Sequence, residues 1–329
     1  MFGRRAIAVV PLALVAAPLL LVMSACGSGV QGGNTAPTTS SKLQLQYSQL
    51  VDVPGATSTR AWAINDVGAI VGDFTVGAIV FTDSGGADSG GARGSAFIRG
   101  PGGTVATVDI PGASGVTLRG INNAGVAVGF YSVDTPHGPN AVTYHGFERT
   151  PDGITTVIDL PDAGDSALLG INNIGDVVGQ YDLVDQSVGG SFVLKQGRFT
   201  TLQDPPGAVP FNVFAGAIND LGVVSGSFLG PNGNEHAFLL RGGTYTTFDD
   251  TGVTTTGLKG LNNGQAVGVS DNGGFIFDIA TLSITTSIDC PGGLFAFPEG
   301  INNQGQIAGR CELAADSPPR PFHGFLVTP

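Results

Sequence analysis

The sequence predicts an all-β protein whose folded part is a six-bladed β-propeller of four-stranded antiparallel blades, closed by an N-terminal strand in the last blade. Short runs of β-branched residues and Phe alternate with turn residues, and no stretch carries a convincing 3.6-residue apolar period. One phrase recurs six times along the chain. The two ends of the folded part carry complementary fragments of one repeat unit, as a closed ring requires.

The recurring phrase reads Ile-Asn-Asn-x-Gly or Ile-Asn-Asp-x-Gly, and its Asn and Gly residues suit a tight turn. The fifth copy, Leu261-Asn262-Asn263-Gly264, starts with Leu and is one residue shorter. Successive copies are 40 to 57 residues apart, a spacing typical of propellers and solenoids. The first asparagines of these repeat turns are Asn65, Asn122, Asn172, Asn219, Asn262 and Asn302.

Two further marks locate the variable part of each unit. A second Gly closes the phrase, at Gly72, Gly129, Gly179, Gly226, Gly268 and Gly309. A Phe follows a small residue, at Phe97, Phe147, Phe192, Phe238, Phe275 and Phe325. The distance from the turn Asn to this Phe ranges from 13 to 32 residues, whereas the distance from the Phe to the next turn Asn stays between 24 and 27. One half of the unit therefore holds a loop that tolerates insertions, as surface loops do.

Each unit predicts four strands. In the third unit we expect strands over 166–171, 176–181, 191–195 and 198–202. The folded part begins with an expected fourth strand, Leu43–Val53, and ends with an expected third strand, Phe322–Val327. Pairing these two would remove two exposed sheet edges. An open β-solenoid and two packed sandwiches are the alternatives, but a solenoid gives no reason for this phase shift.

Three units carry a His two residues before the Phe, in His145-Gly146-Phe147, His236-Ala237-Phe238 and His323-Gly324-Phe325. Set between Pro-Gly-Ala and Ile-Asn-Asn-x-Gly phrases, they resemble the bacterial extracellular HAF repeats. The resemblance covers nearly all of 43–329. It implies an exported repeat protein with no established activity, and so it assigns no functional residue. Three units depart from it, with Ser95-Ala96-Phe97, Gly190-Ser191-Phe192 and Gly273-Gly274-Phe275.

The N-terminus predicts export and lipidation. Arg4 and Arg5 precede an apolar run over 6–22, as in a secretory signal. The following Met23-Ser24-Ala25-Cys26 resembles the lipobox of bacterial lipoproteins, with Met where Leu is usual. We therefore expect a signal peptide over 1–25, a lipidated Cys26 with a flexible linker over 26–42, and the propeller over 43–329. An ordinary secreted protein with an incidental Cys is the alternative. Lipidation would anchor the chain to the cell envelope (the outer membrane of a Gram-negative cell) or the cell surface.

The charge excludes one class of partner. The chain has 14 basic and 26 acidic side chains, and without Arg4 and Arg5 the balance would be 12 against 26, or −14. A surface this acidic repels nucleic acid. We expect a monomer that contacts the membrane through its lipid.

Several residues are candidates for chemistry. The turn asparagines would ring one face near the axis and could hold a cation or a sugar, or could serve the turns alone. The three His lie too far from the axis to share a metal, so we expect them to pack or to link blades by hydrogen bonds. Trp62 takes a glycine-type position of the first strand, for packing or for stacking on a sugar. Cys290 and Cys311 are expected to form a disulfide between adjacent blades.

The opposite face carries the variable loops. Their aspartates could contact Ca²⁺ or another ligand, or could simply be solvated, and they include Asp134, Asp182, Asp185 and Asp271. Apart from this Ca²⁺, no cofactor is implied. Gly-x-Ser-x-Gly, His-Glu-x-x-His and phosphate-loop motifs are absent from the sequence. We therefore expect a binding module that presents the loop face to a protein or glycan. A secreted carbohydrate-active hydrolase or lyase, and a structural envelope protein, are the alternatives. An enzyme should break the repeat with polar residues in the axis or the loop-face cleft.

Overall fold

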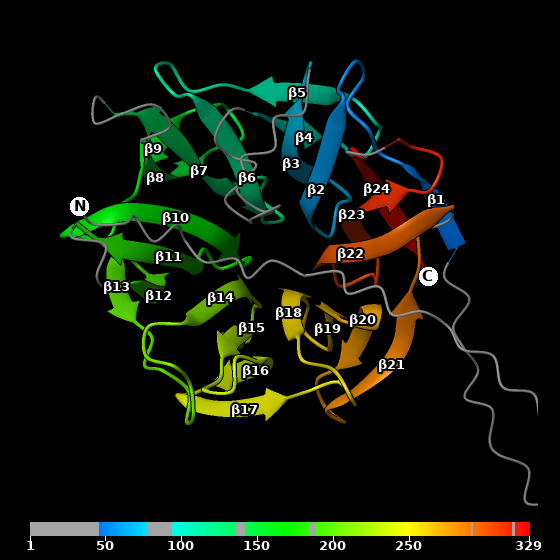
Figure 1. The fold of residues 1–329 in the computed structure, drawn as a ribbon. Coiled ribbons are helices and arrows are strands. Elements are labelled where there is room, and N and C mark those ends of the chain that lie inside the picture. Colours follow the sequence, from blue (N-terminus) through cyan, green and yellow to red (C-terminus); the bar gives the residue numbers. More distant parts are fainter. Residues whose placement is uncertain (1–45, 78–93, 136–141, 185–188, 291, 318–319) are drawn as a thin grey trace, which may run out of the picture.

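The computed structural model describes residues 46–77, 94–135, 142–184, 189–290, 292–317 and 320–329, and their regular structure is entirely β (Figure 1). The predicted signal peptide over 1–25, Cys26, the linker over 26–42 and Asp185 lie outside these residues. In the part of the chain so described, no helix is long and apolar enough to cross a membrane.

Six four-stranded antiparallel sheets form the blades, and we call their strands a to d from the axis outward. The a strands are β2 (Ser58–Ile64), β6 (Gly115–Ile121), β10 (Ala163–Ile171), β14 (Val213–Ile218), β18 (Thr256–Leu261) and β22 (Gly293–Ile301). The b strands are β3 (Ile70–Thr75), β7 (Ala127–Asp134), β11 (Val177–Leu183), β15 (Val224–Leu229), β19 (Gln265–Ser270) and β23 (Ile307–Leu313). The c strands are β4 (Ser95–Arg99), β8 (Val142–Arg149), β12 (Gly189–Lys195), β16 (Glu235–Arg241), β20 (Gly273–Asp278) and β24 (Phe322–Thr328). The d strands are β5 (Val105–Val108), β9 (Thr155–Val157), β13 (Arg198–Thr201), β17 (Thr244–Phe248), β21 (Ser283–Ile288) and β1 (Gln46–Leu50).

Strand β1 closes the ring as the sequence predicts. It pairs antiparallel with β24, joining Leu50 to Phe325, and gives the sixth blade the order β1-β24-β23-β22. Figure 1 shows β1 beside β24, with the six blades arranged around a central axis. Within the described residues, the expected strand over 43–53 is limited to 46–50. The prediction of a six-bladed propeller is confirmed.

The second Gly and the Phe of each repeat are partners across strands b and c. Gly72 faces Phe97, and the same register recurs in all six blades. A Cβ on Gly72 would lie 2.7 Å from the Phe97 ring and would also collide with the carbonyl oxygen of Arg60 on strand a. Gly is therefore required where the ring of strand c packs over strand b, and this explains why the two marks recur together.

The apolar core lies between the blades. Each of the six clusters of buried apolar side chains combines residues of two neighbouring blades, so that every blade is sealed against the next. One cluster joins the first blade to the last, and it includes Val51 and Val53, which follow β1. Burying such a side chain fully stabilises the fold by about 1.5–3 kcal/mol.

Candidate functional site

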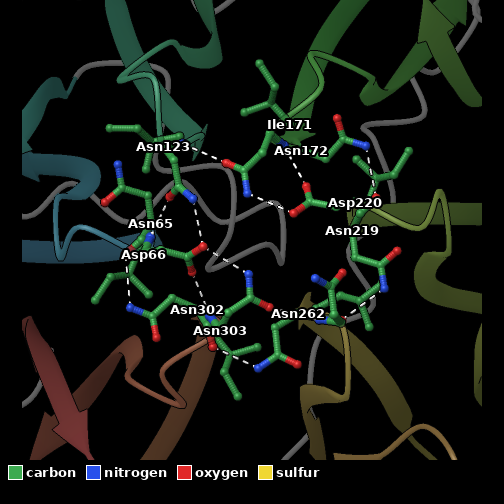
Figure 2. Close-up of a pocket in the computed structure, with 17 residues that line it drawn as sticks. Asn65, Asp66, Asn123, Ile171, Asn172, Asn219, Asp220, Asn262, Asn302 and Asn303 are labelled. Carbon is green, nitrogen blue, oxygen red and sulfur yellow. Dashed lines mark hydrogen bonds between the residues drawn. The ribbon is translucent and has the colours of Figure 1, made fainter.

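At one end of the axis the turn asparagines surround a cavity (Figure 2). The Asn65 side-chain amide donates to the carbonyl oxygen of Asn122 in the next blade at 2.8 Å. The same bond recurs from blade to blade at 2.8–3.3 Å and returns from Asn302 to Asn65 at 2.9 Å. Each amide oxygen accepts a backbone N–H of its own turn, such as that of Ala69 at 2.8 Å. All six side chains are buried.

A second set of bonds joins more exposed groups of the same turns. At five junctions, the residue after the turn Asn, which is Asn or Asp, bonds to its counterpart in the adjacent blade, as in Asp66 N–H to Asn123 Oδ1 at 2.8 Å. Asp66 also accepts two bonds from Asn303, at 2.7 and 3.0 Å, across the junction of the first and last blades. Burial alone would raise the pKa of Asp66, but hydrogen bonds from Asn123 and Asn303 lower it below its usual value.

These bonds define what the turn asparagines do. Their amide oxygens accept from their own turns and their amide nitrogens donate to the neighbouring turns, so they join the blades to one another. The sequence offered two interpretations of these asparagines, and the simpler one was that they only stabilise their own turns. This describes the amide oxygen, which accepts a backbone N–H of the same turn. The amide nitrogen instead donates to the next blade. We call this end of the propeller the Asn face.

The axis holds two cavities, one at the Asn face and one further along, and six Ile and Leu residues line both of them. A different ring of residues surrounds the axis at the second cavity. Strand a has a register shift at the same repeat position in every blade, and the residue it skips lies three positions before the turn Asn. We call these six skipped residues the bulge ring: Trp62, Arg119, Leu169, Gly216, Lys259 and Glu299. They line a cavity of about 420 Å³, which includes its opening.

Trp62 is packed into a polar environment and is only 4% exposed. The guanidinium carbon of Arg119 lies 3.7 Å from the centre of its ring, and that of Arg310 lies 4.5 Å away. Its indole N–H donates to Asp73 Oδ2 at 3.0 Å. The sequence analysis was wrong to give Trp62 a glycine-type position, because Ala63 takes that position and Trp62 is the skipped residue. Its ring is covered by cations and belongs to the packing of the site.

Both carboxylates beside Trp62 are engaged. Asp73 accepts from Arg60 Nε at 2.7 Å and from Thr117 Oγ1 at 3.1 Å, in addition to the indole. Glu299 is ion-paired with Arg310 at 3.3 Å, and both of these side chains are buried. Asp73 and Arg310 follow the second Gly of the first and sixth repeats, so equivalent positions carry opposite charges in adjacent blades. The repeat is therefore broken chemically at the axis while its backbone stays regular.

The His residues of the HAF-like units form contacts inside their own blades. His145 Nδ1 lies 2.8 Å from Asp159, and His236 Nδ1 lies 2.8 Å from Asp249, in each case between strand c and the segment after strand d. In the sixth blade His323 pairs with Asp52, which follows β1, at 2.7 Å. The expectation that these His link different blades is therefore wrong. They fasten strand d to strand c, and in the sixth blade this secures the closing strand.

The three loop-face aspartates that the structure describes do not come together. Asp134, Asp182 and Asp271 stand on three different blades. Burial and the nearby Asp165 raise the pKa of Asp182. Asp271 accepts the backbone N–H and the hydroxyl of Thr254 at 2.8 Å, and these bonds lower its pKa despite burial. Among the residues the structure describes, no three His, Cys, Asp or Glu side chains are grouped to hold a metal ion.

Cys290 and Cys311 are joined by a disulfide, with their Cα atoms 6.2 Å apart. Cys290 follows β21 of the fifth blade, whereas Cys311 lies inside β23 of the sixth. The bond therefore ties the closing blade to its neighbour.

The known proteins that this chain resembles are similar to it in fold alone. No protein-family model matches the chain, and no curated protein matches it. A gluconolactonase from Xanthomonas campestris is 13% identical, with a TM-score of 0.49 over 85% of this chain and 89% of that chain. The propeller domain of the Trilobed protease from Pyrococcus furiosus is 7% identical, with a TM-score of 0.45 over 82% and 94%. The Aleuria aurantia lectin is 10% identical, with a TM-score of 0.34 over 84% and 97%. At these identities the likeness says nothing of activity.

The bulge ring was not predicted from the sequence. One signal could have revealed it, because the position three residues before the turn Asn changes from aromatic to cationic, aliphatic, Gly and anionic. The next position is always Gly or Ala, and the one after that is always Ile or Leu. Only the register shows that the variable residue is the one that the pairing of strands a and b skips.

Proposed function

We propose that the protein is an exported, lipid-anchored binding module of HAF-repeat type whose loop face receives a protein or a glycan. The observation that supports this best is the contrast between the two faces of the ring. On the Asn face, turns of nearly equal length repeat the same blade-to-blade bonds. On the opposite face, the connection between strands b and c ranges from 271–272 in the fifth blade to 76–94 in the first. Loops of varied length on a rigid ring are the usual location of binding sites.

A loop exchange tests the binding role. The connection 76–94 is replaced by the two-residue connection 271–272, and the purified chain is screened on a glycan array and for co-purifying envelope proteins. We expect a ligand of the wild type that the loop exchange loses. The matched control is Ile174→Thr on the Asn face, where the side chain is 70% exposed, and it should bind normally. The proposal fails if the wild type binds nothing in either screen, or if the exchange and the control behave alike.

Lipidation is tested separately. Cys26→Ser should move the protein from the membrane fraction to the soluble fraction, because acyl chains contribute about 0.8 kcal/mol per buried CH₂. Unchanged membrane retention of the Ser variant would refute the lipid anchor and leave the loop-face proposal standing.

A further inference from the structure

The chain enters the propeller from the Asn face. Strand β1 begins at Gln46, which pairs with Thr328 at the end of β24. Pro329 follows and lies at the sixth repeat turn, because a Cβ on Gly305 would be 3.1 Å from the Pro329 ring. The segment that connects Cys26 to the propeller therefore joins it at the Asn face and not at the loop face.

The length of this connecting segment limits how the propeller can stand on a membrane. Nineteen residues separate Cys26 from Gln46, and their Gly-, Ser- and Thr-rich composition predicts a flexible chain. A flexible chain of this length has an r.m.s. end-to-end distance of about 25 Å. A strand of seven residues, such as β11, itself rises about 23 Å. A lipid on Cys26 would thus hold the Asn face close to the bilayer, whereas the opposite orientation would use the whole segment to pass along a blade.

Basic side chains gather on the Asn face of the first four blades. Strand c ends on a basic residue in each of these blades, at Arg99, Arg149, Lys195 and Arg241, and Arg198 begins strand β13 beside them. Carboxylates share this face, at Asp66, Glu148, Asp152, Asp176, Asp220 and Asp278. Asp66 and Asp220 accept hydrogen bonds from neighbouring turns, and Asp176 pairs with Lys195. The Asn face is therefore close to electrical balance, although the chain has a net charge of −12.

The loop face carries most of the negative charge. The segment after strand d holds an aspartate in every blade, at Asp52, Asp109, Asp159, Asp204, Asp249 and Asp289. The segments after strand b add further carboxylates, such as Asp271 and Asp316. Within the described residues of these two sets of connections, Arg320 is the only basic side chain. An anionic surface therefore repels the loop face far more strongly than the Asn face.

The first four blades also expose apolar side chains at their turns. The fourth residue of the turn phrase is Val67, Ala124, Ile174 or Leu221 in these blades, whereas it is Gln304 in the sixth blade and is missing from the fifth. Val67, Ile174 and Leu221 are 58%, 70% and 68% exposed. Apolar and basic side chains on one face are typical of surfaces that lie on anionic bilayers.

We propose that the Asn face of the first four blades contacts the anionic lipid headgroups of the membrane and that the loop face points away from it. The basic residues at the ends of strands c lie next to lipid phosphates, and the apolar turn residues reach the boundary of the acyl chains. Charges act over about 10 Å at 0.1 M salt, so the face nearest the bilayer decides the electrostatic energy. The inference rests on the lipid anchor proposed above, and it adds which face touches the membrane.

Two positions on one strand can report the orientation. Ile174 precedes β11 on the Asn face, Val184 follows it on the loop face, and they are 70% and 76% exposed. Ile174→Cys and Val184→Cys each add one thiol for a fluorophore, since Cys290 and Cys311 are bonded to each other and Cys26 is lipidated. The lipidated full chain is reconstituted in vesicles of phosphatidylcholine and phosphatidylglycerol that contain a lipid with a nitroxide on its headgroup. The label at 174 should lose its emission and the label at 184 should keep it, because about 23 Å separates the two ends of β11.

A charge-matched pair of variants tests the role of the basic residues. Arg198→Gln combined with Arg241→Gln removes two positive charges from exposed positions of the Asn face and should reduce quenching of the label at 174. Arg320→Glu changes the net charge by the same amount on the loop face and should leave this quenching unaltered. Melting curves verify that each variant is folded. Equal quenching in the double variant and the Arg320→Glu control would overturn the inference.

Flotation of the same vesicles separates this inference from the anchor. Wild-type protein that does not float with the vesicles refutes the lipid anchor, and the inference fails with it. Protein that floats, but whose label at 184 is quenched as strongly as the label at 174, overturns the orientation alone. Energy transfer between two copies labelled at 174 would assign the Asn face to a second copy of this chain and would also overturn the inference.

Discussion

Replacing Asn172 with Ala tests whether the asparagine ring holds the blades together. Asn172 is 4% exposed, and its amide nitrogen donates to the carbonyl oxygen of Asn219 in the next blade at 2.9 Å. Its oxygen accepts from the backbone N–H of Asp176 at 2.8 Å and of Ile174 at 3.2 Å. Alanine removes all three bonds. The buried N–H of Asp176 loses its acceptor, whereas the carbonyl of Asn219 still accepts from the N–H of Gly222 at 3.0 Å.

The expected loss has two parts. Leaving the buried N–H of Asp176 without an acceptor costs about 1–3 kcal/mol, and losing the bond to Asn219 costs about 0.5–1.5 kcal/mol, so the free energy of unfolding should fall by about 2–4 kcal/mol. At about 2–4 °C per kcal/mol for a domain of this class, the melting temperature should fall by about 4–16 °C. Asn172→Asp keeps the acceptor but faces the carbonyl of Asn219 with an oxygen, and so it isolates the bond between the blades.

Thermal melting followed by circular dichroism, with urea unfolding in parallel, measures the loss. The control is Asn232→Ala in an exposed loop, where the side chain accepts only a local bond from the N–H of Asn234 at 3.0 Å. Substitutions at such surface sites change stability by about 0.5 kcal/mol or less. If Asn172→Ala melts together with the Asn232→Ala control, the ring contributes no net stability and the reasoning is wrong. If Asn172→Asp melts like the wild type, the bond to the next blade is not the stabilising element.

Three further predictions concern ring closure. Deleting 43–53 removes β1 together with the buried Val51 and Val53, and should lower the melting temperature far more than an equally long deletion within the linker; equal effects would contradict closure by β1. Replacing Cys290 and Cys311 with Ser opens a cross-link spanning 21 residues and should cost about 3 kcal/mol, and reduced wild-type protein should melt like the double variant. Burial lowers the pKa of His323, but bonds and charges from Asp52 and Asp316 outweigh it and raise the pKa above its usual 6.5. Protonated His323 therefore stabilises the fold most below pH 6.5, and this contribution is lost as pH rises through the raised pKa. The melting temperature of Asp316→Asn should thus fall furthest below that of the wild type at acidic pH, and a constant difference across pH would exclude this role.

The repeat itself made the fold predictable. Gly and Phe recur because a Phe ring of strand c packs on the bare backbone of strand b, so the two marks report a local register. The folded part has an extra strand at its N-terminal end and lacks one at its C-terminal end, and this mismatch predicted that the two ends pair to close the ring. By contrast, no partner was predicted for any of the three His, and one of the two roles expected of them, hydrogen bonding between blades, is wrong. The sequence does not reveal that the Asp after strand d returns to the His of the same blade.

The sequence by itself determined the number of blades, the strands of each blade and the closing pair, because each depends on spacings that recur along the chain. It also determined the cysteine pair, because Cys290 and Cys311 are the only cysteines besides Cys26. Only the tertiary structure showed that the turn asparagines bond from blade to blade and that a bulge gathers Trp62, Arg119 and Lys259 around one axial cavity. The physical reason differs between the two. The bonds between turn asparagines join residues 40 to 57 positions apart, or 237 where the ring closes, and a recurring turn phrase does not show which turn each amide reaches. The bulge skips one residue of strand a in each blade, and only the pairing of strands a and b shows which residue this is.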